Sequence, residues 1–144
     1  MKYLAHRDQE SEREQSLIDH LEKTAELAGQ YAEAFGAYQW GYCAGLLHDI
    51  GKYSQEFQRR IRGSEEQVDH ATAGAQLCHE KKGYYSLLSY CIAGHHAGLA
   101  DTGTRNDRSN MPTLYGRLKK QIPDYNAYKG EIQIPQLMEL PFVI

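Results

Sequence analysis

The chain has 144 residues, a formal net charge of −3 and seven histidines. That length suits one domain with a single buried core, so we take 1–144 as one domain. No apolar run approaches the roughly 20 residues of a membrane span, so we expect no membrane partner. An odd set of cysteines (Cys43, Cys78 and Cys91) without a C-x-x-C pair argues against a disulfide framework. It indicates a reduced, cytoplasmic chain whose cysteines pack as small buried side chains.

The negative net charge excludes a chain that is basic throughout, as a general nucleic-acid binder would be. Basic residues do cluster locally, and these clusters are Arg59, Arg60 and Arg62; Lys81 and Lys82; Arg105 and Arg108; and Arg117, Lys119 and Lys120. Solvated helix faces and loops account for any single cluster. A groove that follows a phosphate backbone needs only some of them on one surface.

The apolar spacing predicts a mostly helical chain that begins with a helix from Leu17 to Phe35. Ser16 and Asp19 resemble a capping box, and Gly36 follows as a stop. The residues that recur at helical spacing are Leu17, Leu21, Thr24, Ala28, Tyr31 and Phe35, with His20 beside them. A second helix is predicted from Tyr38 to about Ile50, with Gly51 as its C-terminal cap.

The rest of the chain is predicted to contain shorter helices and one long loop. These elements are a helix around Tyr53 to Ile61, one within 65–82, one from Tyr84 to Gly98, a loop from Ala100 to Pro112, and a short helix within 113–121. A short strand is predicted at Glu131 to Ile134. The fold class is therefore all-α, a compact helical bundle with a short strand or hairpin near the C-terminus.

Several histidines fall in segments predicted to be apolar helix. His48 and Asp49 lie among leucine and isoleucine, where an unpaired charge is costly. His95 and His96 are adjacent imidazoles in another apolar helix, and they also need partners. A shared metal site explains them together, whereas His6 and His79 are expected to be ordinary histidines.

The ligand types narrow the choice of metal. Imidazole nitrogen and carboxylate oxygen together suit one or two ions of Mn, Fe, Co, Ni or Zn. Alkaline-earth ions prefer oxygen ligands alone. No cysteine lies at ligand spacing, which argues against a structural zinc site.

The order of these motifs resembles a known family. His48-Asp49 with flanking helical histidines resembles the HD superfamily of metal-dependent phosphohydrolases. The fuller set resembles the HD nuclease domain of the CRISPR-associated nuclease–helicase of type I systems, over Ser16 to Leu99. The motifs that carry this resemblance are His20, L-L-H-D-I-G-K with His48, Asp49 and Lys52, D-H-A-T-A-G-A with His70, and G-H-H-A-G-L with His95 and His96.

That resemblance implies a helical domain that cuts single-stranded DNA during CRISPR interference. A helicase domain or subunit and an RNA-guided surveillance complex would be its partners. One ion would be held by His20, His48 and Asp49. Asp49 would bridge to a second ion, whose other ligands would be His70, His95 and His96.

Asp49 and Lys52 are the implied catalytic residues, with Lys52 facing the scissile phosphate. A lysine ammonium can neutralise the charge that grows on a phosphoryl group. The alternative for Lys52 is a solvated cation near the end of a helix, where the macrodipole favours it.

The chain departs from this family in its last third. The family usually carries a further aspartate ligand well downstream, after an apolar segment like Leu140 to Ile144. The chain stops there, so we expect it to be incomplete at its C-terminal end. Asp101, Asp107 and Asp124 are expected to be turn-forming residues rather than substitutes for that ligand.

Two further functions remain open from the sequence. One is an HD phosphohydrolase that acts on nucleotides or cyclic nucleotides. The other is a catalytically impaired fragment that docks onto a helicase or a surveillance complex.

Overall fold

The computed structural model describes residues 2–137 and is mostly helical, which confirms the predicted fold class. The α-helices of this part of the chain are α1 (Leu17–Glu33), α2 (Tyr38–Leu47), α3 (Gln55–Ile61), α4 (Thr72–Lys81), α5 (Tyr85–Gly94) and α6 (Leu114–Leu118). Two 3-10 helices, η1 (Ile50–Tyr53) and η2 (Asn126–Gly130), complete the helical elements. The apolar segment 140–144, on which the expected incompleteness rests, lies outside the described residues.

The strand predicted at Glu131 to Ile134 is wrong. Strands form instead near the N-terminus, where β1 (Leu4–Arg7) pairs antiparallel with β2 (Glu14–Ser16). Ile132 is buried in the core without strand partners, and its backbone N–H donates to the Tyr128 carbonyl. Leu4 is also buried, so the hairpin packs on the core through its first strand.

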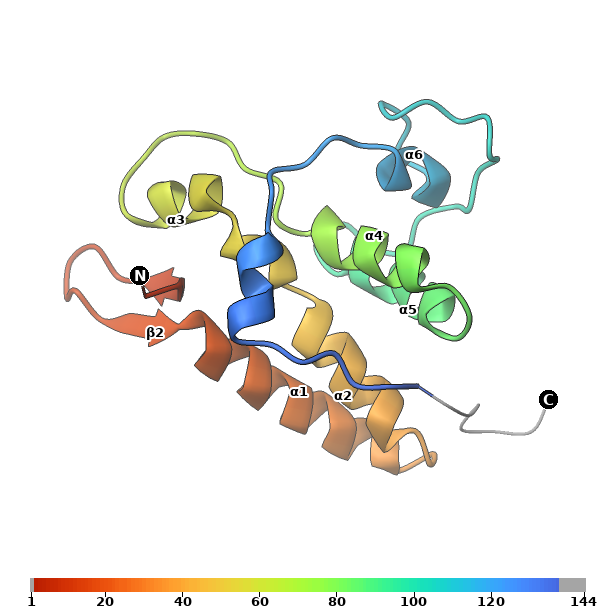
Figure 1. Cartoon of the computed structure of the whole chain (residues 1–144), viewed down its shortest axis with the longest axis horizontal. Coiled ribbons are helices and arrows are strands. Elements are labelled where there is room, and N and C mark those ends of the chain that lie inside the picture. Colours follow the sequence, from red (N-terminus) through yellow and green to blue (C-terminus); the bar gives the residue numbers. More distant parts are fainter. Residues whose placement is uncertain (1, 138–144) are drawn as a thin grey trace.

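The longest helix, α1, packs along α2 at the base of the molecule (Figure 1). The Ser16 hydroxyl accepts a hydrogen bond from the Asp19 N–H and begins α1, as predicted. The residues of α1 that are buried are Leu17, Leu21, Ala25, Gly29 and Ala32. Gly45 on α2 faces the Ala25 backbone at a distance that leaves no room for a Cβ, so the two helices approach closely.

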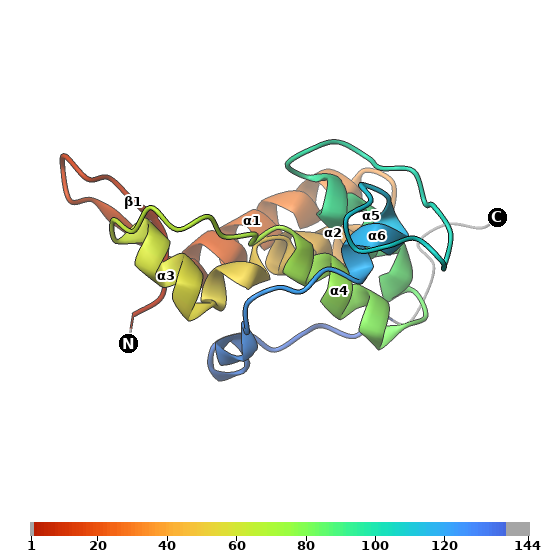
Figure 2. The ribbon, with the colours of Figure 1, turned by 90° about the horizontal axis from the view of Figure 1, so that it is seen from above.

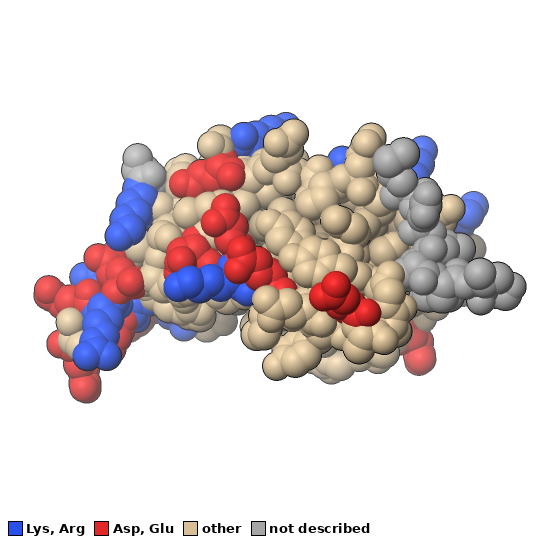
Figure 3. All heavy atoms as spheres, turned by 90° about the horizontal axis from the view of Figure 1, so that it is seen from below, with Lys and Arg blue, Asp and Glu red and all other residues tan. Residues whose placement is uncertain are grey.

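Two side chains of the predicted apolar face of α1 are exposed instead. Tyr31 is 72% exposed, whereas the next residue, Ala32, lies on the buried face of α1. Phe35 is 66% exposed and follows the end of α1 at Glu33. Figure 3 views the molecule from below, the side on which α1 lies in Figure 1. Charged side chains gather at the hairpin end of this face and are sparse over its other half.

Helices α4 and α5 pack against each other, and α5 also contacts α2. The short helix α6 lies beside both α4 and α5 (Figure 2). Both helices that precede site histidines end earlier than predicted. The second helix ends at Leu47 rather than near Ile50, and α5 ends at Gly94 rather than Gly98. His48 and His95 therefore lie at helix C-termini.

After α6 the chain returns past η1 (Figure 1). The Tyr53 hydroxyl donates to Glu131, and the Tyr85 hydroxyl donates to the Pro135 carbonyl. These bonds tie the last described residues to the core. Among the helices of residues 2–137, none is long and apolar enough to cross a membrane.

The prediction for the cysteines holds for two of the three. Cys43 and Cys78 are buried, and burial raises the pKa of each thiol to about 12, so both stay neutral. Cys91 is exposed, which corrects the expectation that all three are buried.

One buried polar side chain attaches the hairpin to the helical core. Gln58 on α3 is fully buried, accepts a hydrogen bond from the Leu4 N–H at 2.9 Å and donates to the Leu4 carbonyl at 3.0 Å. The same amide donates to the Lys52 carbonyl at 2.8 Å. Gln58 therefore holds β1, α3 and η1 together.

We expect Gln58→Leu to destabilise the protein by about 3 kcal/mol, because it leaves buried backbone groups of Leu4 and Lys52 without partners. Urea unfolding measures the change. The exposed Gln55 on the same helix supplies the control, Gln55→Leu, which we expect to change the free energy of unfolding by less than about 0.5 kcal/mol. Equal stability of the two variants would contradict this role for Gln58.

Candidate metal centre

The predicted site residues come from the ends of several helices and converge on one carboxylate. His20 lies in α1, whereas His48 and Asp49 occupy the turn between α2 and η1. His70 precedes α4. His95 and His96 follow α5 directly.

Asp49 is the centre of this cluster, and its side chain is only 8% exposed. Its Oδ2 lies 2.9 Å from His20 Nε2, 3.1 Å from His48 Nε2 and 3.2 Å from Lys52 Nζ. Its Oδ1 lies 3.3 Å from His95 Nε2 and 3.8 Å from His70 Nε2. Each carboxylate oxygen therefore faces its own group of imidazoles.

The imidazole rings form a continuous chain around Asp49. Neighbouring ring centroids are 4.2–5.3 Å apart along the series His20, His48, His95, His96 and His70. The structure thus brings all five predicted histidine ligands together.

The local charges keep Asp49 ionised. Burial by itself favours the neutral acid, but hydrogen bonds from His20, His48 and His95 outweigh burial and hold the pKa of Asp49 well below its usual range. Burial lowers the pKa of His70 to about 4, so this ring is neutral near pH 7 and its lone pair is free to bind a cation. The hydrogen bond to Asp49 raises the pKa of His95.

Two groups of side chains have the spacing of metal ligands. His20, His48 and Asp49 form one, and Asp49, His70 and His96 form the other; within each, the ligand atoms lie within 4.8 Å of one another. Asp49 is common to both. His95 stands between the groups, with its Nε2 beside Asp49 Oδ1. The assignment of these residues as ligands remains a prediction, and their placement suits it.

Hydrogen bonds at the helix ends set the tautomers of two histidines. His48 Nδ1 lies 2.6 Å from the Gly45 carbonyl, and His95 Nδ1 lies 2.6 Å from the Ile92 carbonyl. A carbonyl only accepts, so each Nδ1 carries the proton. Nε2 of each ring faces an oxygen of Asp49 and donates to it only when the ring is protonated; in the neutral ring both atoms are acceptors and repel each other. A cation between them, either a proton or a metal ion, relieves this repulsion, and the donor set fits a divalent transition metal.

Gly51 brings the His70 backbone close to η1. A Cβ at Gly51 would collide with the His70 carbonyl oxygen, so only glycine permits this approach. Gly51 was predicted to cap the second helix, but its φ is not positive, and close packing is the role that the structure gives it. Asp69 orders the backbone on both sides of His70, because its carboxylate accepts hydrogen bonds from the backbone N–H groups of Ala71 and Thr72.

Lys52 is buried, which overturns the alternative of a solvated helix cation. Its side chain is 7% exposed, and Nζ lies 3.2 Å from Asp49 Oδ2 and 3.4 Å from the Ala5 carbonyl oxygen. The ammonium lies beside the Asp49 carboxylate, and the Lys52 side chain also lines a cleft next to the cluster. Its phosphate-facing role remains a prediction.

His6 was expected to be an ordinary histidine, yet β1 places it at the edge of the cluster. Its ring centroid lies 5.0 Å from that of His20. His6 belongs to neither ligand group formed within residues 2–137. The sequence carried no signal for this position, because the polar N-terminal segment shows no strand periodicity.

Two of the downstream aspartates, Asp107 and Asp124, behave as turn residues. Asp107 accepts hydrogen bonds from Thr104 and Thr113, and Asp124 accepts the Asn126 N–H. Neither they nor Asp101 join the two ligand groups of the described chain, residues 2–137.

Residues 17–127, well over half of the chain, match the HD domain family. The chain therefore belongs to the HD domain family. Proteins of this family are metal-dependent phosphohydrolases that bind divalent metals, and this chain has that class of activity. No curated protein matches the chain.

We expect Gly51→Ala to separate His70 from Asp49 and to destabilise the fold by about 1–3 kcal/mol, because the added methyl group overpacks the turn. In calorimetric titration with Mn²⁺, the affinity of the group that contains His70 should fall relative to the unmodified protein, and the affinity of the group that contains His20 and His48 should change less. Gly130→Ala is the matched control, since a Cβ there meets no atom within 4 Å. Unchanged binding in Gly51→Ala would rule out this positioning role.

We expect Asp49→Asn to abolish the rise in melting temperature that Mn²⁺ produces, because both ligand groups lose their common carboxylate. The substitution also costs about 3 kcal/mol without metal, since Lys52 loses its buried partner. The double variant Asp49→Asn with Lys52→Met should recover most of that stability but no metal binding. Recovery of the Mn²⁺ effect in the double variant would argue against Asp49 as a ligand.

Proposed function

We propose that this chain is a metal-dependent nuclease that hydrolyses single-stranded DNA in CRISPR interference. The observation that carries the proposal is the Asp49 carboxylate common to two histidine groups, with the Lys52 ammonium beside it. The motif order and spacing support the choice of substrate. A helicase domain or subunit and an RNA-guided surveillance complex would deliver the displaced strand.

The ligand groups suggest how the ions would be held. His20, His48 and Asp49 would hold one divalent ion, and Asp49, His70 and His96 the other, with His95 beside the shared carboxylate. Bound ions of this kind supply Lewis acidity and lower the pKa of coordinated water. His96 is exposed, so the second group is open to a substrate from solvent.

The chain's own residues add positioning and charge. Lys52 and His70 line an open cleft beside the metal centre, so a phosphate in that cleft would meet both the ammonium and the ligand groups. Contacts with Asp49 and the Ala5 carbonyl hold the ammonium in place. A fixed cation stabilises phosphoryl charge in the transition state without reorganisation.

The test compares substrates side by side in Mn²⁺, Co²⁺ or Ni²⁺. We expect cleavage of a labelled single-stranded oligonucleotide, with slower or no turnover of deoxynucleoside triphosphates and cyclic nucleotides. Lys52→Met should lower kcat by about 100-fold. Asp49→Asn should remove activity altogether and serves as the background control.

Two outcomes would replace this proposal. Turnover of nucleotides or cyclic nucleotides without DNA cleavage would assign the chain to a nucleotide-directed phosphohydrolase. Failure to bind any of the ions would assign it to a catalytically impaired docking role.

A further inference from the structure

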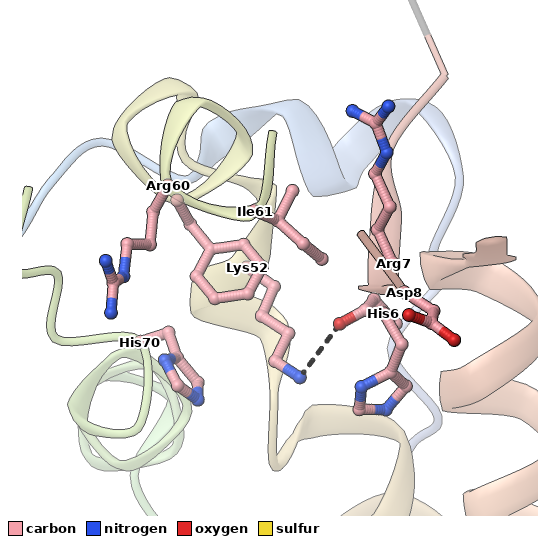
Figure 4. A pocket seen from close by; sticks show the side chains of 9 residues that line it. His6, Arg7, Asp8, Lys52, Arg60, Ile61 and His70 are labelled. Carbon is pink, nitrogen blue, oxygen red and sulfur yellow. Dashed lines mark hydrogen bonds between the residues drawn. The ribbon is translucent and has the colours of Figure 1, made fainter. Parts of the chain in front are cut away.

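A cleft of about 540 Å³ adjoins the metal centre. It lies between the hairpin and α3, with η1 as its floor (Figure 4). Its lining includes the side chains of His6, Lys52, Phe57, Arg60, Ile61 and His70. Two of these, Lys52 and His70, also belong to the cluster around Asp49, so the cleft and the metal centre are continuous.

Figure 4 shows how the walls are arranged. Arg60 and His70 lie on one side, His6 lies on the opposite side, and Lys52 reaches between them. Phe57 and Ile61 make part of the α3 wall apolar, and Lys52 Nζ lies 5.3 Å from the centroid of the Phe57 ring. The cleft therefore combines cationic groups with an apolar surface that suits a sugar or a base.

Three cations, Arg7, Lys52 and Arg60, line the cleft against one acid, so its charge is positive. Asp8 is the acidic residue that lines it, but its carboxylate is already engaged, with the Ser11 hydroxyl at 2.6 Å and the Glu10 N–H at 3.0 Å. Asp49 does not line the cleft and is paired with Lys52. An anionic group entering the cleft would therefore meet the cations first.

Arg60 differs from its neighbour Arg59 in what it contacts. Arg59 does not line the cleft, and it pairs with Glu56 at 3.9 Å and Glu66 at 3.4 Å. Arg60 donates to the Ser64 carbonyl at 3.0 Å, and within residues 2–137 it forms no ion pair. A guanidinium without a carboxylate, at the rim of a cleft that leads to a metal centre, is suited to bind a phosphate.

We infer that this cleft binds the DNA strand next to the scissile phosphate, and that Arg60 contacts the neighbouring phosphate. The inference rests on the proposed nuclease function and adds to it a subsite for a polynucleotide strand. A strand that leaves the metal centre past Lys52 reaches the Arg60 rim, while Phe57 and Ile61 offer contact to the intervening sugar or base. A nucleoside monophosphate or a cyclic mononucleotide has no second phosphate to use this rim.

The experiment compares Arg60→Ala with Arg59→Ala, which removes the same charge from the same helix. The substrates are a dinucleotide, which has one phosphodiester, and a ten-nucleotide single strand. We expect the ratio of kcat/KM for the longer strand to that for the dinucleotide to fall about 10-fold in Arg60→Ala, through KM. Arg59→Ala should keep the ratio of the unmodified protein.

Binding provides a second readout. The slope of log affinity against log salt concentration for the ten-nucleotide strand should become shallower by about 0.7 in Arg60→Ala, as expected for one lost phosphate contact. Arg60→Lys should keep that slope while recovering only part of the affinity, because a lysine cannot bind a phosphate in bidentate fashion.

The outcomes separate the two proposals. If the unmodified protein cleaves the strand but Arg60→Ala and Arg59→Ala have the same substrate ratio, the subsite is overturned and the nuclease function stands. If the unmodified protein cleaves neither substrate while it turns over nucleotides, the nuclease function and the subsite fall together.

Discussion

The buried carboxylate of Asp49 is the constraint on which the rest of the site depends. An ionised carboxylate away from water is costly unless cations and hydrogen-bond donors surround it. Here the partners come from α1, from the turn after α2, from η1, and from the segments that precede α4 and follow α5. The same carboxylate that needs these partners for stability offers each of its oxygens to a separate set of histidines. Folding and metal binding therefore use one group.

Small residues make this convergence possible. Gly45 lets α2 approach the α1 backbone, Gly51 lets η1 approach His70, and Gly74 lets α4 approach the Leu47 carbonyl. Each contact draws a helix end toward Asp49. Helix ends also carry free carbonyls, and His48 and His95 donate to these carbonyls through Nδ1. Their Nε2 atoms are thereby directed at the carboxylate rather than at solvent.

The metal centre and its surroundings contribute different parts of the function. Membership of the HD domain family accounts for metal-dependent phosphohydrolysis, and the cluster around Asp49 is the site predicted to serve it. The choice of substrate depends on what surrounds that cluster. In this chain the hairpin and α3 provide those surroundings, and the buried Gln58 amide holds the two together. The cleft between them is thus a built feature of the fold rather than a gap between loose segments.

The helical class and the start of α1 at Ser16 follow from local periodicity and capping chemistry, so they could be predicted from the sequence. The histidines and the aspartate of the site were predictable from residue chemistry together with the motif order that resembles the HD superfamily. The ends of the histidine-bearing helices, the burial of Lys52 and the place of His6 beside His20 depend on tertiary contacts. The hairpin is the clearest case. Leu4 pairs with Gln58, which lies 54 residues away, and no local pattern reports a bond over that separation. Contacts between distant segments set helix ends, burial and strand pairing, so these features emerge only when the chain is folded.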